Sequence, residues 1–306
     1  MRIYCAGLVQ GGFVFRAKKS SKQIALLEDL RRAYPYDLES YHYIKENDEA
    51  IEYYRHLKKT IFLDSGAFSM FTQGIKIDLK VYADYIKAHA DVIHVASNLD
   101  EIGQHREQDS YNNQRALERY GVKVQPVHHA RDDDKWLLKY MAEGYDYIFL
   151  GGMVAESTKY LRGWLDHVWH KYLTNKDGSA KIKVHGFGLT TVELMRRYPW
   201  YSVDSTSWVI TGRFGSIYLD MPGRDFKLFI SDQSPTKKDW DRHYDTLSPL
   251  LRGRVDEYIR SLGYDPALLR TDYGWRDHWN IAFFMRMMQR PEPVFLSTHQ
   301  PVVSLF

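Results

Sequence analysis

The stretch TIFLDSGAFSMF, residues Thr60–Phe71, contains the pattern that decides the fold. Its apolar run Ile61–Leu63 is short and bounded by turn-forming residues, which predicts a buried strand. The run ends at an acid, Asp64, and the small residues after it predict a tight turn into a helix. The stretch therefore has the form of a strand–helix unit whose strand ends in a carboxylate.

The same pattern recurs along the chain, with helical segments between the apolar runs. Strands are predicted at Ile3–Gly7, Ser40–Ile44, Ile61–Ala67, Val92–Asn98, Lys123–His128, Tyr147–Met153, Lys183–Leu189 and Tyr201–Trp208. Eight such units in about 215 residues predict an α/β fold of the TIM (β/α)8 barrel class. A doubly wound open sheet is the alternative, but no GxGxxG follows the first strand, which argues against a dinucleotide-binding version.

Capping residues indicate where the helices begin and end. Predicted caps are Ser20 with Gln23, Asn47, Asp78, and Thr190 with Glu193, and predicted terminating glycines are Gly121 and Gly144. The strand–helix alternation stops after the eighth unit. We therefore predict a catalytic barrel over residues 1–215 and a mostly helical extension packed on the barrel over residues 216–306, in which MPGRDFK is loop and HWNIAFFMRMMQR is helix.

Composition narrows the class of protein. The 306 residues are 44% hydrophobic and 26% charged, which is typical of a globular domain. The net charge of +3 permits an anionic partner without requiring one. The single cysteine, Cys5, excludes an internal disulfide and a multi-cysteine zinc site. No apolar run reaches the length of a membrane span, so we predict a cytoplasmic protein with no membrane partner.

Polar residues gather at the predicted strand ends, where TIM barrels carry their catalytic groups. The third and eighth strands contribute Asp64 and Asp204, which we expect to face each other across a ligand. The other candidates are Asp100 after the fourth strand, Gln125 and His128 on the fifth, Gly151 and Gly152 on the sixth, and His185 on the seventh. Paired carboxylates suit attack on a sugar carbon combined with proton transfer to the leaving group.

Five of these segments together resemble the motifs of the tRNA-guanine transglycosylase superfamily. DSGAF (Asp64–Phe68) is similar to that family's DSGG-aromatic signature, and LDE (Leu99–Glu101) to its FDE. LGGMVAES (Leu150–Ser157), HGFG (His185–Gly188) and VDSTSWVITGRFG (Val203–Gly215) resemble its IGGLAVGE, MGVG and nucleophile segments. The motifs occur in the family's order, over roughly residues 55–215 of the barrel.

The resemblance implies an enzyme, a pentosyltransferase that exchanges guanine for a 7-deazaguanine base through a covalent glycosyl intermediate and needs no cofactor or metal. Asp204 would be the nucleophile and Asp64 the general acid/base. Ser65 would make room for the base, and Phe68 would stack on it. Asp100 would accept hydrogen bonds from the guanine N–H groups, and His128 or Gln125 would contact the guanine carbonyl. The other implied contacts are those of Gly151, Gly152 and His185 with the base and of Arg213 with a phosphate.

The chain departs from the family in ways that bear on its substrate. Ala67 and Ser69 replace a glycine and a glutamine, His128-His129 stands in place of a Gln-Gly pair, and Ile210 replaces an arginine. The cysteine-rich zinc module that docks tRNA is absent. The chain therefore resembles most the compact, zinc-less branch that places 7-deazaguanines, such as 7-cyano-7-deazaguanine, into DNA in phages and bacterial modification clusters. The resemblance also implies a homodimer or a partner subunit.

Three alternatives stay open. The same exchange on tRNA is the first. A metal-dependent barrel hydrolase is the second, with ligands drawn from His94, His128, His129, His185 and Asp204. The third is a non-catalytic subunit that only binds nucleic acid, although such a subunit tends to lose the acids that Asp64 and Asp204 provide.

Overall fold

The computed structural model of the chain describes residues 1–8, 28–103, 105–154, 156–189, 191–221, 224–234 and 242–291. Their contacts divide them into two compact units. The first unit takes in residues 1–8, 36–205 and 291, and the second takes in residues 28–35 and 206–290. The division falls after Ser205, whereas the sequence pattern placed the border at residue 215.

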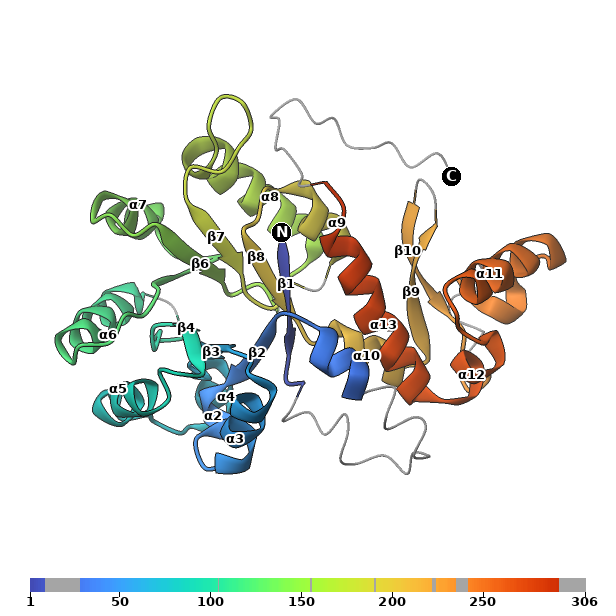
Figure 1. Cartoon of the computed structure of the whole chain (residues 1–306). Coiled ribbons are helices and arrows are strands. Elements are labelled where there is room, and N and C mark those ends of the chain that lie inside the picture. The colour runs from blue at the N-terminus through green and yellow to red at the C-terminus, as the bar shows by residue number, and fades with distance from the viewer. Residues whose placement is uncertain are drawn as a thin grey trace. The chain divides into compact units, whose positions relative to one another are not determined.

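The first unit is a TIM-barrel-like α/β fold, which confirms the predicted fold class. Its eight parallel strands form one curled sheet in the order β4-β3-β2-β1-β8-β7-β6-β5 (Figure 1). The strands are β1 (Arg2–Ala6), β2 (Asp37–Ser40), β3 (Ile61–Asp64), β4 (Ile93–Ala96), β5 (Val127–His129), β6 (Tyr147–Gly151), β7 (Lys183–Gly186) and β8 (Ser202–Ser205).

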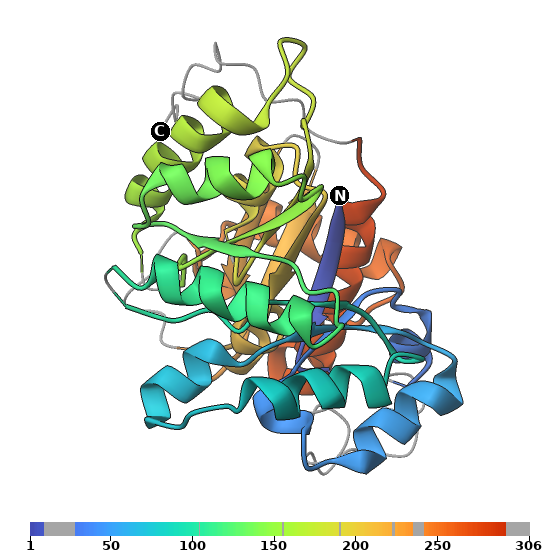
Figure 2. The same cartoon turned by 90° about the vertical axis from the view of Figure 1, so that its left-hand side faces the viewer.

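Helices alternate with these strands. They are α2 (Tyr41–Ile44), α3 (Asp48–Leu57), α4 (Ala67–Gln73), α5 (Leu79–Ala88), α6 (Glu107–Arg119), α7 (Asp134–Ala142), α8 (Thr158–Val168), the π-helical turn η1 (Trp169–Leu173) and α9 (Val192–Arg197). Figure 2 views the unit from the side of α5, α6 and α7 and shows these helices in front of the strands. The helices therefore form the outer layer of the unit.

Most predicted helix signals that fall on described residues work as expected. The Asn47 side chain accepts from the Ala50 N–H, and the Asp78 carboxylate accepts from Lys80 and Val81. Gly121 and Gly144 follow α6 and α7 with φ of 81° and 87°, a left-handed conformation that favours glycine. The predicted caps at Ser20, Gln23 and Thr190 lie outside the described residues.

Alternation along each strand separates two apolar layers. Phe62, Val127 and Phe149 point to the same cluster inside the curled sheet. Ile61 and Leu63, the neighbours of Phe62, belong instead to the cluster between the sheet and its helices. Because side chains alternate between faces, Asp64 shares the inner face with Phe62 and lies at the carboxyl end of the strand.

The predicted strand Ser40–Ile44 is wrong. The strand is β2, which ends at Ser40, and Tyr41–Ile44 forms the short helix α2. The strand was not predicted because it contains two acids, Asp37 and Glu39, which the sequence suggests are exposed. Both side chains are almost fully buried. Lys59 forms an ion pair with Asp37, and the Tyr54 hydroxyl donates to Glu39. These partners allow two carboxylates to lie beneath the helical layer.

The curled sheet has a seam between its two end strands. β4 and β5 form no ladder with each other, and the isolated bridge Ser97↔Gln125 joins the segments beside them. Backbone hydrogen bonds from Gln125 N–H to the Ala96 carbonyl and from Asn98 N–H to the Gln125 carbonyl, both 2.9 Å, accompany this bridge. The seam is therefore held by one backbone bridge, whereas each of the seven neighbouring strand pairs in the sheet forms a ladder.

The second unit combines a hairpin with helices. Its elements are a helical segment at residues 28–33, α10 (Ser207–Arg213), β9 (Ser216–Met221), β10 (Arg224–Phe229), the 3-10 turn η3 (Tyr244–Thr246), α11 (Pro249–Ser261), α12 (Pro266–Thr271) and α13 (Tyr273–Met288). The expected loop MPGRDFK is corrected in part, because Arg224–Phe229 pairs antiparallel with β9. The mostly helical character of the C-terminal region is confirmed. Among the described residues, no helix has both the length and the apolarity that crossing a bilayer requires.

Candidate functional site

Asp64 lies where β3 turns into α4. The turn needs a glycine, since Gly66 has φ of +78° and a Cβ there would lie 2.6 Å from the His42 Cβ. The Gly66 N–H donates to the Asp64 carboxyl at 3.1 Å. Burial, followed by the negative charges of Asp100 and Asp204, raises the pKa of Asp64 to about 7. Asp64 can therefore hold or release a proton at neutral pH.

Asp204 is the second-last residue of β8 and is only 6% exposed. Its Oδ1 accepts a 2.7 Å hydrogen bond from the Gly188 N–H. Gly188 has φ of +60°, and a Cβ at this position would lie 2.6 Å from the Val154 Cγ2. The turn after β7 is thus shaped to place one N–H donor on the Asp204 carboxylate. The other oxygen of Asp204 has no hydrogen-bond partner among the described residues, and it is not one of the buried, unpartnered polar atoms of those residues.

His185 supports Asp204 from inside the barrel. Its Nδ1 lies 2.7 Å from the Ser202 hydroxyl, which in turn lies 2.6 Å from the Tyr147 hydroxyl. Its Nε2 lies 3.3 Å from Asp204 Oδ1 but is not aligned for a hydrogen bond. Burial lowers the pKa of His185, so the imidazole is neutral at pH 7. His185 is therefore a packed neighbour of the carboxylate and carries no charge to it.

The third acid, Asp100, is paired across the seam. It follows β4, and its Oδ2 lies 2.7 Å from the Nε2 of His129, the last residue of β5. Burial alone would lower the pKa of His129, but the hydrogen bond and charge of Asp100 raise it above the ordinary value. The pair therefore carries a charge-assisted hydrogen bond at the carboxyl end of the sheet.

His129, which the sequence analysis considered only as a metal ligand, is the fifth-strand residue that contacts an acid of the site. The fifth strand was expected to present His128, but Val127 faces the inner cluster, so alternation turns His129 inward and His128 outward. The His128 ring is fully buried and lies 6.2 Å from the Trp164 ring. The structure does not bring His128 to the three acids. The signal that identifies His129 is its parity with Val127.

Gly151 and Gly152 lie beside His129. Register pairs Gly151 with His129, and a Cβ on Gly151 would lie 2.7 Å from the His129 Cδ2. Gly151 therefore makes room for the imidazole. Gly152 is exposed, with φ of +70°, so its backbone is accessible at the mouth. Whether either glycine contacts a base stays a prediction.

Ser65 and Phe68 flank the Asp64 turn. Ser65 is buried, and its N–H donates to the Ser97 hydroxyl at 2.8 Å, which ties the turn after β3 to the segment after β4. Phe68 is 55% exposed on α4. Phe71, one helical turn further along, is 60% exposed. Sequence reasoning did not single out this second aromatic, although the i, i+3 spacing predicts a shared helix face.

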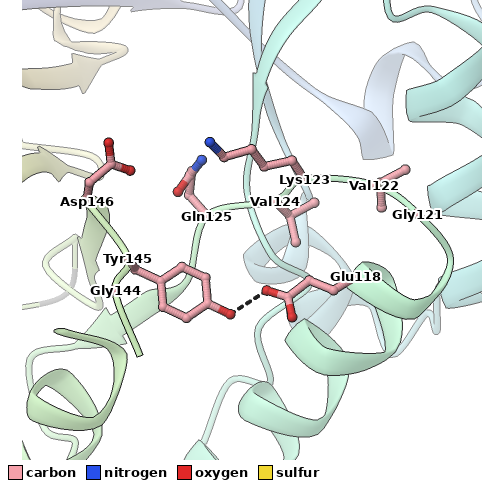
Figure 3. Close-up of a pocket in the computed structure, with 9 residues that line it drawn as sticks. All are labelled: Glu118, Gly121, Val122, Lys123, Val124, Gln125, Gly144, Tyr145 and Asp146. Carbon is pink, nitrogen blue, oxygen red and sulfur yellow. Dashed lines mark hydrogen bonds between the residues drawn. The ribbon is translucent and has the colours of Figure 1, made fainter. Parts of the chain in front are cut away.

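Gln125 forms a backbone bridge with Ser97, in the segment after β4, and its predicted contact with the guanine carbonyl stays a prediction. It lines a pocket of about 410 Å³ with segments that precede β5 and β6, among them Gly144 and Asp146 (Figure 3). Asp146 is the residue before β6, whereas Gly151 ends that strand, so the pocket lies toward the amino end of β6. Arg213 is exposed on α10 in the second unit. Its predicted phosphate contact stays a prediction.

The three acids form one electrostatic group. Asp100 and Asp204 both act on Asp64, and they come from different strand ends of the same sheet. Like charges placed close together favour retention of a proton by one of them. The described residues contain no group of three or more His, Cys, Asp or Glu side chains arranged to hold a metal. The candidate site is therefore a carboxylate site at the carboxyl ends of β3, β4 and β8.

Comparisons with known proteins add little to this description. No protein-family model and no curated protein matches the chain. Among solved structures, the tryptophan synthase alpha chain from Legionella pneumophila subsp. pneumophila has 7% sequence identity and a TM-score of 0.44, over 94% of this chain and 93% of that chain. A likeness at this level carries no argument about function, so we interpret the site from its own residues.

His128 gives a first testable prediction, on stability. Among the described residues neither of its ring nitrogens has a hydrogen-bond partner, and burial lowers its pKa to about 4. The unfolded chain binds a proton at an ordinary pKa near 6.5, so His128 costs stability progressively as pH falls from about 6.5 to 4. Between pH 7 and pH 4.5, the free energy of unfolding should fall by about 2–3 kcal/mol less in His128→Leu than in the unmodified protein.

Urea unfolding at these two pH values measures the difference. His94 and His185, whose pKa values burial also lowers, remain in both proteins and serve as a common background. Equal losses of stability in the two proteins would show that His128 is not buried in its neutral form.

Proposed function

We propose that this chain is a guanine transglycosylase that exchanges guanine in DNA for a 7-deazaguanine base, such as 7-cyano-7-deazaguanine. One observation carries the proposal: Asp64, with a pKa raised to about 7, is coupled to the negative charges of Asp100 and Asp204. Base exchange needs one carboxylate that attacks and one carboxyl group that delivers a proton. Asp204 and Asp64 suit these two roles.

In the proposed first step, an Asp204 oxygen attacks the anomeric carbon of the deoxyribose. The bond from this carbon to guanine breaks, its electron pair stays with the base, and Asp64 donates its proton to the leaving guanine. In the second step, Asp64 removes a proton from the incoming base, which attacks the same carbon and releases the Asp204 carboxylate. The Gly188 N–H, 2.7 Å from Asp204 Oδ1, fixes the orientation of the nucleophile throughout.

Exposed aromatic residues beside the Asp64 turn support a nucleic-acid substrate. Phe68 and Phe71 project from α4 with more than half of their surface in water. The Tyr43 hydroxyl of α2 lies 3.5 Å from the Ser69 hydroxyl and adds a third exposed ring near this helix. Stacking of a nucleobase on an aromatic side chain contributes about 1–3 kcal/mol per base. The arrangement suits a base that has left the helical stack.

We propose DNA over tRNA because the sequence contains a single cysteine. The zinc module that docks tRNA in the family that this chain resembles requires several. A duplex substrate would have to flip out its target guanine, which costs a few kcal/mol. Stacking on the aromatics of α4 would offset part of this cost.

Label incorporation tests the proposal. The full chain is incubated with duplex DNA, single-stranded DNA or tRNA, together with radiolabelled guanine or 7-cyano-7-deazaguanine, and the label that enters the polymer is counted. We expect label in DNA and none in tRNA. Label in tRNA alone would overturn the choice of polymer and leave the chemistry in place. No label in any polymer would overturn the proposed function.

A matched variant controls for the loss of an acid as such. Asp91 is exposed at the amino end of β4, where it pairs with Arg55 at 2.7 Å, and it belongs to the same unit as the site. Asp91→Asn removes one carboxylate from the opposite end of a strand that the site uses. It should incorporate label at the unmodified rate.

A further inference from the structure

Three side chains form a buried hydrogen-bond chain that leads to Asp204. The Tyr147 hydroxyl lies 2.6 Å from the Ser202 hydroxyl, which lies 2.7 Å from Nδ1 of His185. On the other edge of the imidazole, Nε2 lies 3.3 Å from Asp204 Oδ1. Ser202 and His185 are fully buried, and Tyr147 is 6% exposed. The protons of the chain are therefore shared among these side chains rather than with solvent.

The partners of the chain decide which imidazole nitrogen carries the proton. Burial raises the pKa of Tyr147, so its hydroxyl keeps its proton, and among the described residues its one hydrogen-bond partner is Ser202. If Tyr147 donates to Ser202 and Ser202 donates to Nδ1, both hydroxyl protons have acceptors and the proton of the neutral imidazole lies on Nε2. If Nδ1 carried the proton and donated to Ser202, one hydroxyl proton would lack an acceptor in a buried site, and the Nε2 lone pair would face a carboxylate. The first arrangement is therefore the more stable one.

Aromatic neighbours hold the imidazole in this orientation. The rings of Phe62, Phe149 and Phe187 have centroids 4.6, 5.1 and 4.8 Å from that of His185. Nε2 is buried, and within the described part of the chain no acceptor is aligned with it. Asp204 Oδ1 at 3.3 Å accounts for this otherwise unpartnered nitrogen, because an N–H dipole with its positive end toward a carboxylate is favourable before the hydrogen bond closes.

The two oxygens of Asp204 are consequently unlike. Oδ1 accepts from the Gly188 N–H at 2.7 Å and lies beside Nε2 of His185. Oδ2 has no hydrogen-bond partner among the described residues and is not one of their buried, unpartnered polar atoms. Donors at Oδ1 fix the orientation of the carboxylate, and an oxygen without donors keeps its full nucleophilicity.

Resting on the proposed function, we propose that the chain holds the His185 proton on Nε2 and that His185 is a positioning residue, which reserves Oδ2 of Asp204 for attack on the sugar. With one ring edge on Ser202 and the other on Asp204, the imidazole acts on the nucleophile rather than on the base.

The proposal assigns each atom of the carboxylate a part in the exchange. The bond from Oδ2 to the anomeric carbon forms while the bond from that carbon to guanine breaks, and guanine takes the electron pair of the broken bond and the Asp64 proton. Oδ1 becomes the carbonyl oxygen of the ester. When the incoming base breaks the ester, the negative charge returns to the carboxylate, where the N–H groups of Gly188 and His185 stabilise it.

Nitrogen NMR of the full chain, labelled with ¹⁵N-histidine, tests the direction of the hydrogen-bond chain without any substrate. The signals of His185 are those that disappear in His185→Gln. We expect Nδ1 to have the chemical shift of an unprotonated nitrogen and Nε2 that of a protonated one. Ser202→Ala should change the Nδ1 shift, since the donor to Nδ1 is gone. A proton on Nδ1, or the same Nδ1 shift in both proteins, would overturn the inference.

The kinetics of label incorporation then separate positioning from base contact. His185→Phe keeps a ring among the aromatic neighbours but removes both nitrogens. It should lower kcat at least about tenfold and change the KM for the incoming base less than about twofold. His185→Gln should recover most of the loss, because its amide N–H can reach the place of Nε2. Thermal melts establish that each variant is folded.

An unchanged kcat in His185→Phe, a change confined to KM, or no recovery in His185→Gln would overturn the positioning role alone. Absence of label with the unmodified protein would overturn the proposed function and the positioning role with it. The NMR result would then still decide the direction of the chain, so the two failures are distinguishable.

Discussion

Asparagine in place of Asp204 is expected to reduce base exchange by at least about 10³-fold, because an amide cannot form the glycosyl ester that carries the sugar between the two bases. The substitution changes little else. An asparagine oxygen can still accept from the Gly188 N–H at 2.7 Å, and the volume of the side chain is preserved. The loss should therefore appear in the chemical step, with the fold intact.

A trapped intermediate is the more direct measurement. The unmodified protein mixed with labelled DNA, with no incoming base, should give a covalent protein–DNA band on a denaturing gel, and Asp204→Asn should give none. Asp91→Asn, at the other end of β4, should give the full band. A covalent band that persists in Asp204→Asn would place the nucleophile on another residue.

Replacing Asp64 by asparagine should slow exchange by about 10²–10⁴-fold and, at the same time, stabilise the protein at alkaline pH. The folded protein holds the Asp64 proton up to about pH 7, whereas an unfolded chain releases it near the ordinary value of 3.8. Between these values the folded state binds more protons than the unfolded state, so stability falls as pH rises. Above about pH 7 both states are ionised and the cost is complete.

The full pKa difference corresponds to about 4 kcal/mol, and because Asp64 is only partly buried we expect about 2–4 kcal/mol. In urea unfolding at pH 8, the free energy of unfolding of Asp64→Asn should exceed that of the unmodified protein by this amount. Near pH 4 the two values should be equal. A stability difference that does not grow with pH would show that the folded protein does not raise the pKa of Asp64. Asp100→Asn removes one of the negative neighbours of Asp64, so the loss should still begin near pH 3.8 but should be smaller and should be complete at a lower pH.

Much of the first unit could be predicted from local chemistry. Strand ends, the caps at Asn47 and Asp78, and the terminating glycines Gly121 and Gly144 depend on residues close in sequence. β2 could not be recognised in this way. Its acids Asp37 and Glu39 are compatible with burial only because Lys59 and Tyr54, distant in sequence, provide an ion pair and a hydrogen bond.

The site divides along the same line. The acids Asp64, Asp100 and Asp204 follow strands, and in a barrel all strand ends of one kind meet at one mouth. His128 was preferred to His129 because a strand buried on both faces does not show which side chain points inward, and the parity with Val127 is informative only once Val127 is known to face the inner cluster. The place of His129 opposite Gly151 depends on the register between β5 and β6, which tertiary packing decides.

The seam between β4 and β5 links the protonation of one side chain to the closure of the sheet. Asp100 follows β4 and His129 ends β5, so their 2.7 Å contact spans the gap where the sheet has a single backbone bridge. The charge of Asp100 helps to raise the pKa of His129, and opening the seam would take that charge away from the imidazole. Loss of the imidazolium proton should therefore favour opening of the seam, and closure of the seam should favour uptake of the proton.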